Sequence, residues 1–238
     1  MLAGGCGVSD YQNRLDEQRK RIQVIDEFNN LLDDPIDIPT MQIGVSREEQ
    51  PAWPFEVFLR LPKGYSATPK DKTPYYIALF RYAGDDPNFN IFIVAAHIAE
   101  PDEKQVFGKY HPKTFKLYVK TALEEYLFKT TKAKVSLVEP KEESSDVVKS
   151  FAIYPEDAKR ILYRQFEYRE PGGTRTKDVS VFRVHLHEDA GKQICVIEHR
   201  LTRTANEAHD NAFKASLRTL DISADAIGKR AQFKKTRG

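Results

Sequence analysis

Residues 179–201 read VSVFRVHLHEDAGKQICVIEHRL, and the order of elements that they predict recurs elsewhere in the chain. Two β-rich runs, 179–187 and 193–201, flank a polar segment that contains Gly191. Runs of this kind on either side of a short glycine-containing segment are typical of a β-hairpin. The stretch therefore predicts two antiparallel strands joined by a turn near Ala190.

A helix is predicted after this hairpin, at Asn206–Leu220, because the apolar residues follow a helical spacing. Asn206 or Thr204 can cap this helix, since a short polar side chain accepts a backbone N–H bond at a helix N-terminus. Glu207 is also well placed for the positive end of the helix dipole.

The same order of elements occurs earlier in the chain. Tyr75–Tyr82 and Phe89–Ile98 are β-rich runs that flank turn-forming residues, and His111-Pro112 opens a helix that extends to about Phe128. Proline suits the first position of a helix, where its missing N–H is harmless. The buried face of this helix is expected to contain Phe115, Val119, Ala122 and Tyr126.

Two sequence matches indicate an internal repeat. Residues 115–122 read FKLYVKTA and residues 213–220 read FKASLRTL, with apolar residues at corresponding places. We predict a tandem duplication, with module 1 at 42–130 and module 2 at 131–227. The alternative is that ordinary α+β patterning imitates a repeat. The remaining strands are expected at Gln42–Ser46, Phe55–Leu61, Lys134–Val138, Lys149–Tyr154 and Ile161–Tyr168.

One long helix is predicted at 9–32, capped by Ser9 or Asp10. Its narrow apolar stripe consists of Tyr11, Leu15, Ile22, Ile25 and Leu32. A helix with such a narrow stripe is expected to lie on the surface of a domain or to pair with another helix, and not to be buried in a core. Two prolines make 33–41 a stiff linker. The fold class is therefore α+β, an N-terminal helix followed by two repeated antiparallel-sheet-plus-helix modules.

Each module opens with a strand that runs into a proline turn, continues through a hairpin and closes with a helix. This order resembles the PsbP-like α/β modules, and Leu61-Pro62-Lys63-Gly64-Tyr65 is similar to their opening turn. Module 2 departs from it, because Pro155-Glu156-Asp157-Ala158 lacks the glycine. The resemblance implies a binding or accessory protein and not an enzyme.

The segment Ala3-Gly4-Gly5-Cys6 resembles the end of a bacterial lipoprotein signal. The resemblance implies that Cys6 is acylated and anchors the protein to the membrane of the cell envelope. Gly7 after the cysteine is compatible with outer-membrane delivery. The usual leucine three residues before the cysteine is replaced by Ala3, and Met1-Leu2 is too short for a charged and an apolar signal region. The lipobox-like N-terminus at 1–8 therefore requires a start that is truncated or mis-assigned. The alternative is that Cys6 is an ordinary cysteine near a plain disordered N-terminus.

Composition supports a folded chain. Among 238 residues, 40% are hydrophobic and 11% are aromatic, enough for a substantial core. No run approaches the ~18 apolar residues of a membrane span. Cys6 and Cys195 are the two cysteines, so a disulfide framework and tetrahedral zinc–cysteine sites are excluded. Cys195 lies in an apolar run, where cysteine usually acts as a small buried hydrophobe.

The net charge of +2 indicates no partner, but the C-terminal end is strongly basic. Residues 228–238 contain no acid, and their basic residues are Lys229, Arg230, Lys234, Lys235 and Arg237. We predict a basic disordered tail there, with nucleic-acid phosphates or anionic lipid as possible contacts. An exported protein meets little nucleic acid, so a soluble cytosolic protein that binds nucleic acid through this tail is the alternative reading.

His185-Leu186-His187 is the most suggestive short motif, since alternate residues of a strand face the same side. Glu188 and His199 are the natural further ligands of a metal ion. With the turn near Ala190, however, His199 lies roughly 10 Å farther along the ladder. Two histidines alone make an incomplete site. We therefore expect no metal, and a metal-dependent enzyme using His185 and His187 is a third hypothesis.

No catalytic constellation is evident in the sequence. The other histidines have no neighbouring nucleophile with an orienting group, and no glycine-rich phosphate loop is present, so no cofactor is expected. The leading hypothesis is a lipid-anchored cell-envelope protein that binds a partner protein, not an enzyme. Its expected contact surfaces are the exposed sheet faces and the hairpin tips near Asp85 and Asp189.

Overall fold

The computed structural model describes residues 6–36, 54–67, 80–84, 86, 88–100, 109–140, 142–152, 157–172, 178–202 and 206–237. In the terminal helices, side chains are described from Ser9 onward and up to Phe233. The helices are α1 (Cys6–Leu31), α2 (Pro112–Thr131), α3 (Glu207–Leu217) and α4 (Ala226–Arg237). The strands are β1 (Leu32–Pro35), β2 (Arg60–Pro62), β3 (Ser66–Ala67), β4 (Phe80–Ala83), β5 (Phe89–Ile98), β6 (Lys109–Tyr110), β7 (Ser144–Lys149), β8 (Arg160–Arg169), β9 (Ser180–Asp189) and β10 (Lys192–Leu201). The α+β class is confirmed.

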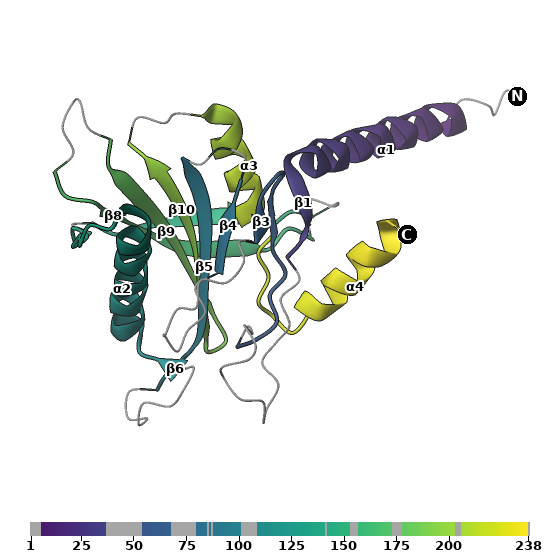
Figure 1. The fold of residues 1–238 in the computed structure, drawn as a ribbon. Helices are drawn as coiled ribbons and strands as arrows, with labels where there is room; N and C mark the ends of the chain where they lie inside the picture. Colours follow the sequence, from purple (N-terminus) through teal and green to yellow (C-terminus); the bar gives the residue numbers. More distant parts are fainter. Residues whose placement is uncertain are drawn as a thin grey trace, which may run out of the picture.

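An eight-stranded sheet forms the centre of the molecule (Figure 1). Its order is β3-β4-β5-β10-β9-β8-β7, with β6 paired to β5 in parallel. The long strands β5 and β10 lie side by side and antiparallel over nine residue pairs. A separate two-stranded sheet pairs β1 with β2.

The predicted hairpin is confirmed as β9 and β10. Ala190 and Gly191 form its two-residue turn with φ angles of 45° and 75°, and two positive φ values suit the right-handed twist of the strands. His185 lies opposite Val196, and His199 lies opposite Phe182. A turn centred near Ala190 predicts Cys195 and Val181 at these places, so the predicted register differs from the observed one by a single residue.

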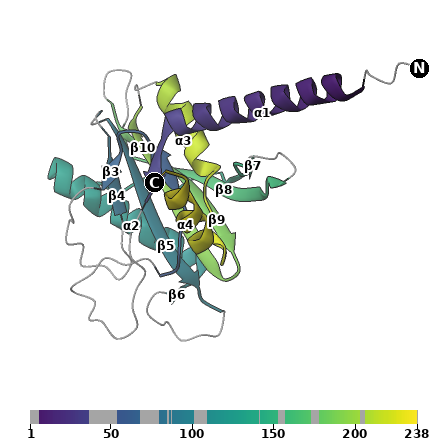
Figure 2. The same cartoon turned by 90° about the vertical axis from the view of Figure 1, so that its right-hand side faces the viewer.

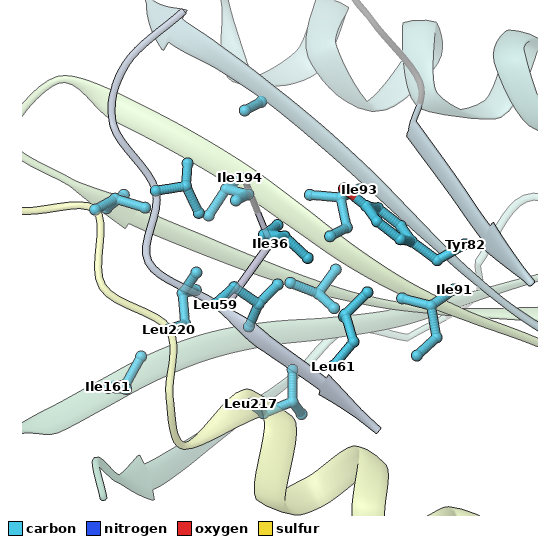
Figure 3. Close-up of a cluster of buried hydrophobic side chains, with 14 of the residues drawn as sticks. Ile36, Leu59, Leu61, Tyr82, Ile91, Ile93, Ile161, Ile194, Leu217 and Leu220 are labelled. Carbon is cyan, nitrogen blue, oxygen red and sulfur yellow. The ribbon is translucent and has the colours of Figure 1, made fainter. Parts of the chain in front are cut away.

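Helices cover both faces of the sheet, because the long strands are apolar on both sides. Helix α2 packs Phe115 and Val119 against Phe92 and Val94 of β5. Helix α3 covers the other face, where Leu217 lies in one cluster with Ile91 and Ile93 of β5 (Figure 3). The expected burial of Phe115, Val119 and Ala122 is confirmed, and Tyr126 is partly buried. The cap at Asn206 is also confirmed.

The ranges predicted as modules 1 and 2 contribute strands to the same sheet. Strands β3 to β5 come from 42–130, and β7 to β10 come from 131–227. Both large core clusters combine residues of the two ranges, for example Ile93 with Val196. The tandem duplication itself stays a prediction.

Helix α1 projects away from the sheet (Figures 1 and 2). It begins at Cys6, so Ser9 and Asp10 lie inside the helix and their prediction as caps is wrong. Residues 32–35, predicted as linker, form β1 instead, because β2 offers them an antiparallel partner. Within the described ranges, no helix is both long and apolar enough to span a membrane.

Three further differences concern irregular segments. The strand predicted at Lys149–Tyr154 lies earlier in the chain, as edge strand β7 at Ser144–Lys149, since pairing with β8 satisfies the backbone of this polar stretch without apolar side chains. Lys134–Val138 forms only an isolated bridge between Val138 and Arg169. The predicted disordered tail is wrong for 228–237, which belongs to α4. Gln42–Ser46 lies outside the described residues.

Candidate functional site at the foot of helix α1

A cavity of about 290 Å³ lies where the end of α1, the turn after β2 and the start of α3 meet. Its volume is close to the lower end of the range for small-molecule sites. Polar and apolar side chains contribute to its wall. The described lining residues are Asn30, Leu31, Pro62, Lys63, Tyr65, Gly84, Asp86, Phe89, Asn206, Ala208, His209 and Ala212.

A chain of hydrogen bonds leads from this cavity into the protein interior. The hydroxyl of Tyr65 lies 3.0 Å from Nδ1 of His209. Nε2 of His209 lies 3.0 Å from Oε1 of Glu198, and the other oxygen of Glu198 accepts from Nη1 of Arg183 at 3.1 Å. Glu198 is 1% exposed, so its charge depends on these partners.

Local structure fixes each member of this network. Asn206 caps α3 by accepting the backbone N–H of His209, which sets the first helical turn. The His209 ring packs beside two aromatic rings, with its centroid 4.2 Å from that of Phe89 and 6.2 Å from that of Phe213. Glu198 reaches it from β10, on the sheet face that α3 covers. Gly84 packs against the Tyr65 ring, which a Cβ at this position would approach to 3.0 Å.

Burial and neighbouring charges set the protonation states of Glu198 and Tyr65, the two residues that flank His209 in this network. Burial alone would raise the pKa of Glu198, but the hydrogen bond from His209 and the charge of Arg183 outweigh it and lower the pKa. Burial, with added repulsion from Glu198 and Asp86, raises the pKa of Tyr65. At neutral pH the network therefore contains an ionised carboxylate at its inner end and an intact phenol at the cavity.

The histidines of the predicted motif lie on one face of β9, and each makes other contacts. His187 makes a hydrogen bond through Nδ1 to the carbonyl of Leu162 at 2.9 Å. His185 is buried beside Phe213, and burial lowers its pKa to about 4. Among the described residues, no three His, Cys, Asp or Glu side chains are grouped to hold a metal ion.

The two further ligands suggested for that motif lie on the opposite face of the sheet. His199 stacks on Phe182, with ring centroids 4.6 Å apart, on the side that α2 covers. Its Nδ1 lies 3.1 Å from the side-chain nitrogen of Asn90. Glu188 pairs with Arg164. The pleat of the sheet therefore separates Glu188 and His199 from His185 and His187.

Two residues of the predicted basic tail contact the body of the protein. Lys229 pairs with Asp221, and Arg230 pairs with Glu56 at 3.5 Å and donates to the Val57 carbonyl. The side chains of Lys234, Lys235 and Arg237 lie outside the described residues. Part of the basic charge is therefore used within the fold.

The two cysteines differ in position. Cys195 is a free, fully buried thiol in the core, as expected from its apolar run. Cys6 is the first residue of α1, and its side chain lies outside the described residues. Acylation of Cys6 stays a prediction.

The network of Tyr65, His209 and Glu198 was missed in the sequence. Its members are far apart in the chain, 144 residues in the case of Tyr65 and His209. One signal was present, because the carboxylate of Glu198 directly follows the apolar run 194–197 within a predicted strand. A carboxylate in such a place needs a buried partner, and that requirement could have directed attention to the nearby His209.

Comparisons with known proteins give a distant structural likeness. The chain is similar to the solution structure of cyanobacterial PsbP (CyanoP) from Synechocystis sp. PCC 6803, with a TM-score of 0.37 and 12% identity over 71% of this chain and 87% of that one. It is also similar to the Saccharomyces cerevisiae Ran-binding protein Mog1p, with a TM-score of 0.36 and 6% identity over 70% of this chain and 90% of that one. A mutant of the protein Mog1 gives a TM-score of 0.38 at 8% identity, with 70% and 90% covered.

No protein-family model matches the sequence. No curated protein matches it either.

Proposed function

We propose that this chain is a lipid-anchored protein of the cell envelope, tethered through Cys6, that binds a partner protein and catalyses no reaction. The observation that supports this proposal most is the length of α1 and its position between Cys6 and the sheet. The helix has 26 residues and begins at Cys6, so at about 1.5 Å per residue it separates a lipidated cysteine from the sheet by about 39 Å. Such a helix acts as a stalk.

Hydrogen bonds and a ring contact attach α1 to the body, which a stalk requires. Arg60 donates to the Asn29 side chain at 2.8 Å, to the Leu32 carbonyl at 3.0 Å and to the Asp33 carbonyl at 2.8 Å. Charge-assisted bonds to the end of a helix are strong and directional. Phe28 adds a stacked contact with Phe151, with centroids 3.9 Å apart. The direction of α1 is thereby fixed relative to the sheet.

The anchor is tested by replacing the acylated residue. In a bacterial host that processes lipoproteins, the full-length gene is expressed with its native upstream sequence, either unchanged or with Cys6→Ser. The unchanged protein should partition with membranes and carry acyl chains by mass spectrometry, and Cys6→Ser should lose both properties. Cys195→Ser is the matched control and should partition as the unchanged protein. The lipid anchor would be refuted if the protein from the unchanged gene carried no acyl chains and did not partition with membranes.

The binding role is tested separately in the envelope. A photo-reactive amino acid at Asp189, which ends the exposed tip of β9, should cross-link one defined envelope protein. The same group at Tyr163, which is 0% exposed, is the control and should give no such product. The absence of any specific product from exposed positions of the sheet edges would count against a protein partner.

A further inference from the structure

The hydrogen-bond directions at the cavity follow from the ionised state of Glu198. A carboxylate only accepts, so Nε2 of His209 carries a hydrogen and donates to Oε1 of Glu198 at 3.0 Å. When the imidazole is neutral, its Nδ1 has a lone pair, and the hydroxyl of Tyr65, 3.0 Å away, donates to this atom. Tyr65 and His209 both line the cavity, and in this state the Tyr65 oxygen keeps lone pairs that can accept a hydrogen bond.

The surroundings of this oxygen are acidic. Burial is the largest cause of the raised pKa of Tyr65, and the negative charges of Glu198 and Asp86 raise it further. Oδ1 of Asp86 accepts from the backbone and side-chain nitrogens of Asn88, both at 2.9 Å. The other oxygen of Asp86 has no partner among the described residues. The cavity thus combines two acceptor groups with the aromatic ring of Phe89 in its wall.

We propose that this cavity binds a small amine, whose N–H group donates to the oxygen of Tyr65 and whose positive charge is balanced by Asp86, and that protonation of His209 releases it. A protonated His209 donates through both ring nitrogens, so Nδ1 takes a lone pair of the Tyr65 oxygen and the phenol hydrogen turns toward the cavity. The Tyr65 hydroxyl is then a hydrogen-bond donor in the cavity, and an ammonium group no longer finds an acceptor there. The proposal goes beyond the proposed function and depends on neither the lipid anchor nor the partner protein.

The charged groups that face His209 come from several elements. Glu198 of β10 contacts it directly, and Arg183 of β9 contacts the far oxygen of Glu198. Asp210 follows it on α3 and pairs with Arg200 of β10 at 3.6 Å. These carboxylates and guanidinium groups largely compensate each other, so protonation of His209 changes the net charge of the site by one unit.

Lining residues also limit the size and charge of the ligand. Lys63 is the cationic side chain among the described lining residues, and it disfavours a second positive charge. Leu31, Pro62 and Ala212 supply apolar contacts for a short hydrocarbon group. A monoamine with a short aliphatic chain therefore fits the cavity better than a polyamine.

Titration of the full chain, carrying Cys6→Ser for solubility, with propylammonium chloride tests the proposal. Binding is followed by the NMR signals of the His209 imidazole, with propionate as an anion of similar shape. Propylammonium should bind saturably at mildly alkaline pH and dissociate as His209 becomes protonated, whereas propionate should not bind. Tyr65→Phe should weaken amine binding about tenfold, the effect of one lost hydrogen bond, and Tyr11→Phe on the exposed part of α1 should not.

A second variant separates the switch from the binding. His209→Gln cannot be protonated, so any amine binding that it retains should be independent of pH. No saturable binding of propylammonium, equal binding of propionate, or an unchanged affinity in Tyr65→Phe would each overturn the proposal. A negative result here leaves membrane partition through Cys6 unaffected, so the two proposals fail independently.

Discussion

The guanidinium carbon of Arg60 lies 4.8 Å from the centre of the Phe233 ring. The same carbon lies 6.0 Å from the centre of the Phe28 ring. Phe28 belongs to α1 and Phe233 to α4, so one buried cation contacts both terminal helices. Arg60 is 4% exposed, and its nitrogen atoms donate to Asn29 of α1 and to two carbonyls of β1. The two ends of the chain are therefore coupled through a single side chain of β2.

Replacing Arg60 tests this coupling. Arg60→Ala leaves three oxygen acceptors without their donor, one on Asn29 of α1 and two in β1, and removes the aliphatic part of the side chain from the core. We expect a loss of about 2–4 kcal/mol in the free energy of unfolding and faster proteolysis within α1. Urea denaturation and limited proteolysis measure the two effects. Arg19→Ala, whose side chain is 73% exposed, should change stability by less than ~0.5 kcal/mol.

Gly84 tests the position of the Tyr65 ring. In Gly84→Ala the new Cβ would lie 3.0 Å from the ring, so the ring must move and its hydrogen bond to His209 must lengthen. We expect a loss of about 1 kcal/mol and an altered NMR signal of the His209 imidazole. Gly228→Ala in α4 is the matched control, because no atom lies within 4 Å of its Cβ. That control should leave His209 unchanged and stabilise the helix by up to ~1 kcal/mol.

The buried histidines His185 and His199 predict loss of stability in acid. Burial lowers the pKa of each ring from 6.5 to about 4. Because the folded pKa is depressed, the unfolded state binds more protons between these values, and stability falls as the pH drops from 6.5 to about 4. Each ring should contribute about 3 kcal/mol to this loss. Glu198, whose pKa is lowered from 4.5, adds its own loss only below that pH.

Urea denaturation across this pH range measures the effect. His185→Leu should remove about half of the pH dependence, because the remaining buried ring still has to accept a proton on unfolding. A free energy of unfolding that stays constant between pH 6.5 and 4 would show that the two rings are not buried in their neutral form.

Local patterns explain which parts of the fold could be predicted from sequence. The β9–β10 hairpin depends on two adjacent runs and a two-residue turn, and α3 depends on a stripe and on its Asn206 cap. All these signals lie within a few neighbouring residues. The helix at 9–32 was recognised for the same reason, although its start at Cys6 was not.

Long-range and backbone-driven features were not predictable in this way. The pairing of β5 with β10 joins strands about 100 residues apart, and either strand could have found another partner by pattern alone. Strand β7 has few apolar residues, since an edge strand needs only backbone partners on one side. The contact of Tyr65 with His209 required both the sheet and α3 to be placed first.

The thiol of Cys195 should not react with thiol reagents in the folded protein. Its side chain is 0% exposed, and burial raises the pKa of the thiol, so little reactive thiolate forms near neutral pH. In the Cys6→Ser variant, a disulfide reagent such as Ellman's should label no thiol until denaturant is added. Labelling in dilute denaturant should then follow the rate of unfolding. Rapid labelling of the native protein would contradict the burial of this residue.

Lys229 distinguishes a structural role of the C-terminal helix from a role in nucleic-acid binding. Burial alone would raise the pKa of Asp221, but hydrogen bonds from Lys229 and Ser223 lower it, so the carboxylate is ionised and depends on Lys229. Lys229→Met should therefore lower the free energy of unfolding at neutral pH by about 1–2 kcal/mol, since it leaves a mostly buried carboxylate without its cation. Lys214→Met on the exposed side of α3 is the control and should be nearly neutral. If Lys229→Met instead leaves stability unchanged and abolishes salt-dependent DNA binding, the basic residues of α4 serve nucleic acid, and the alternative reading of the sequence gains support.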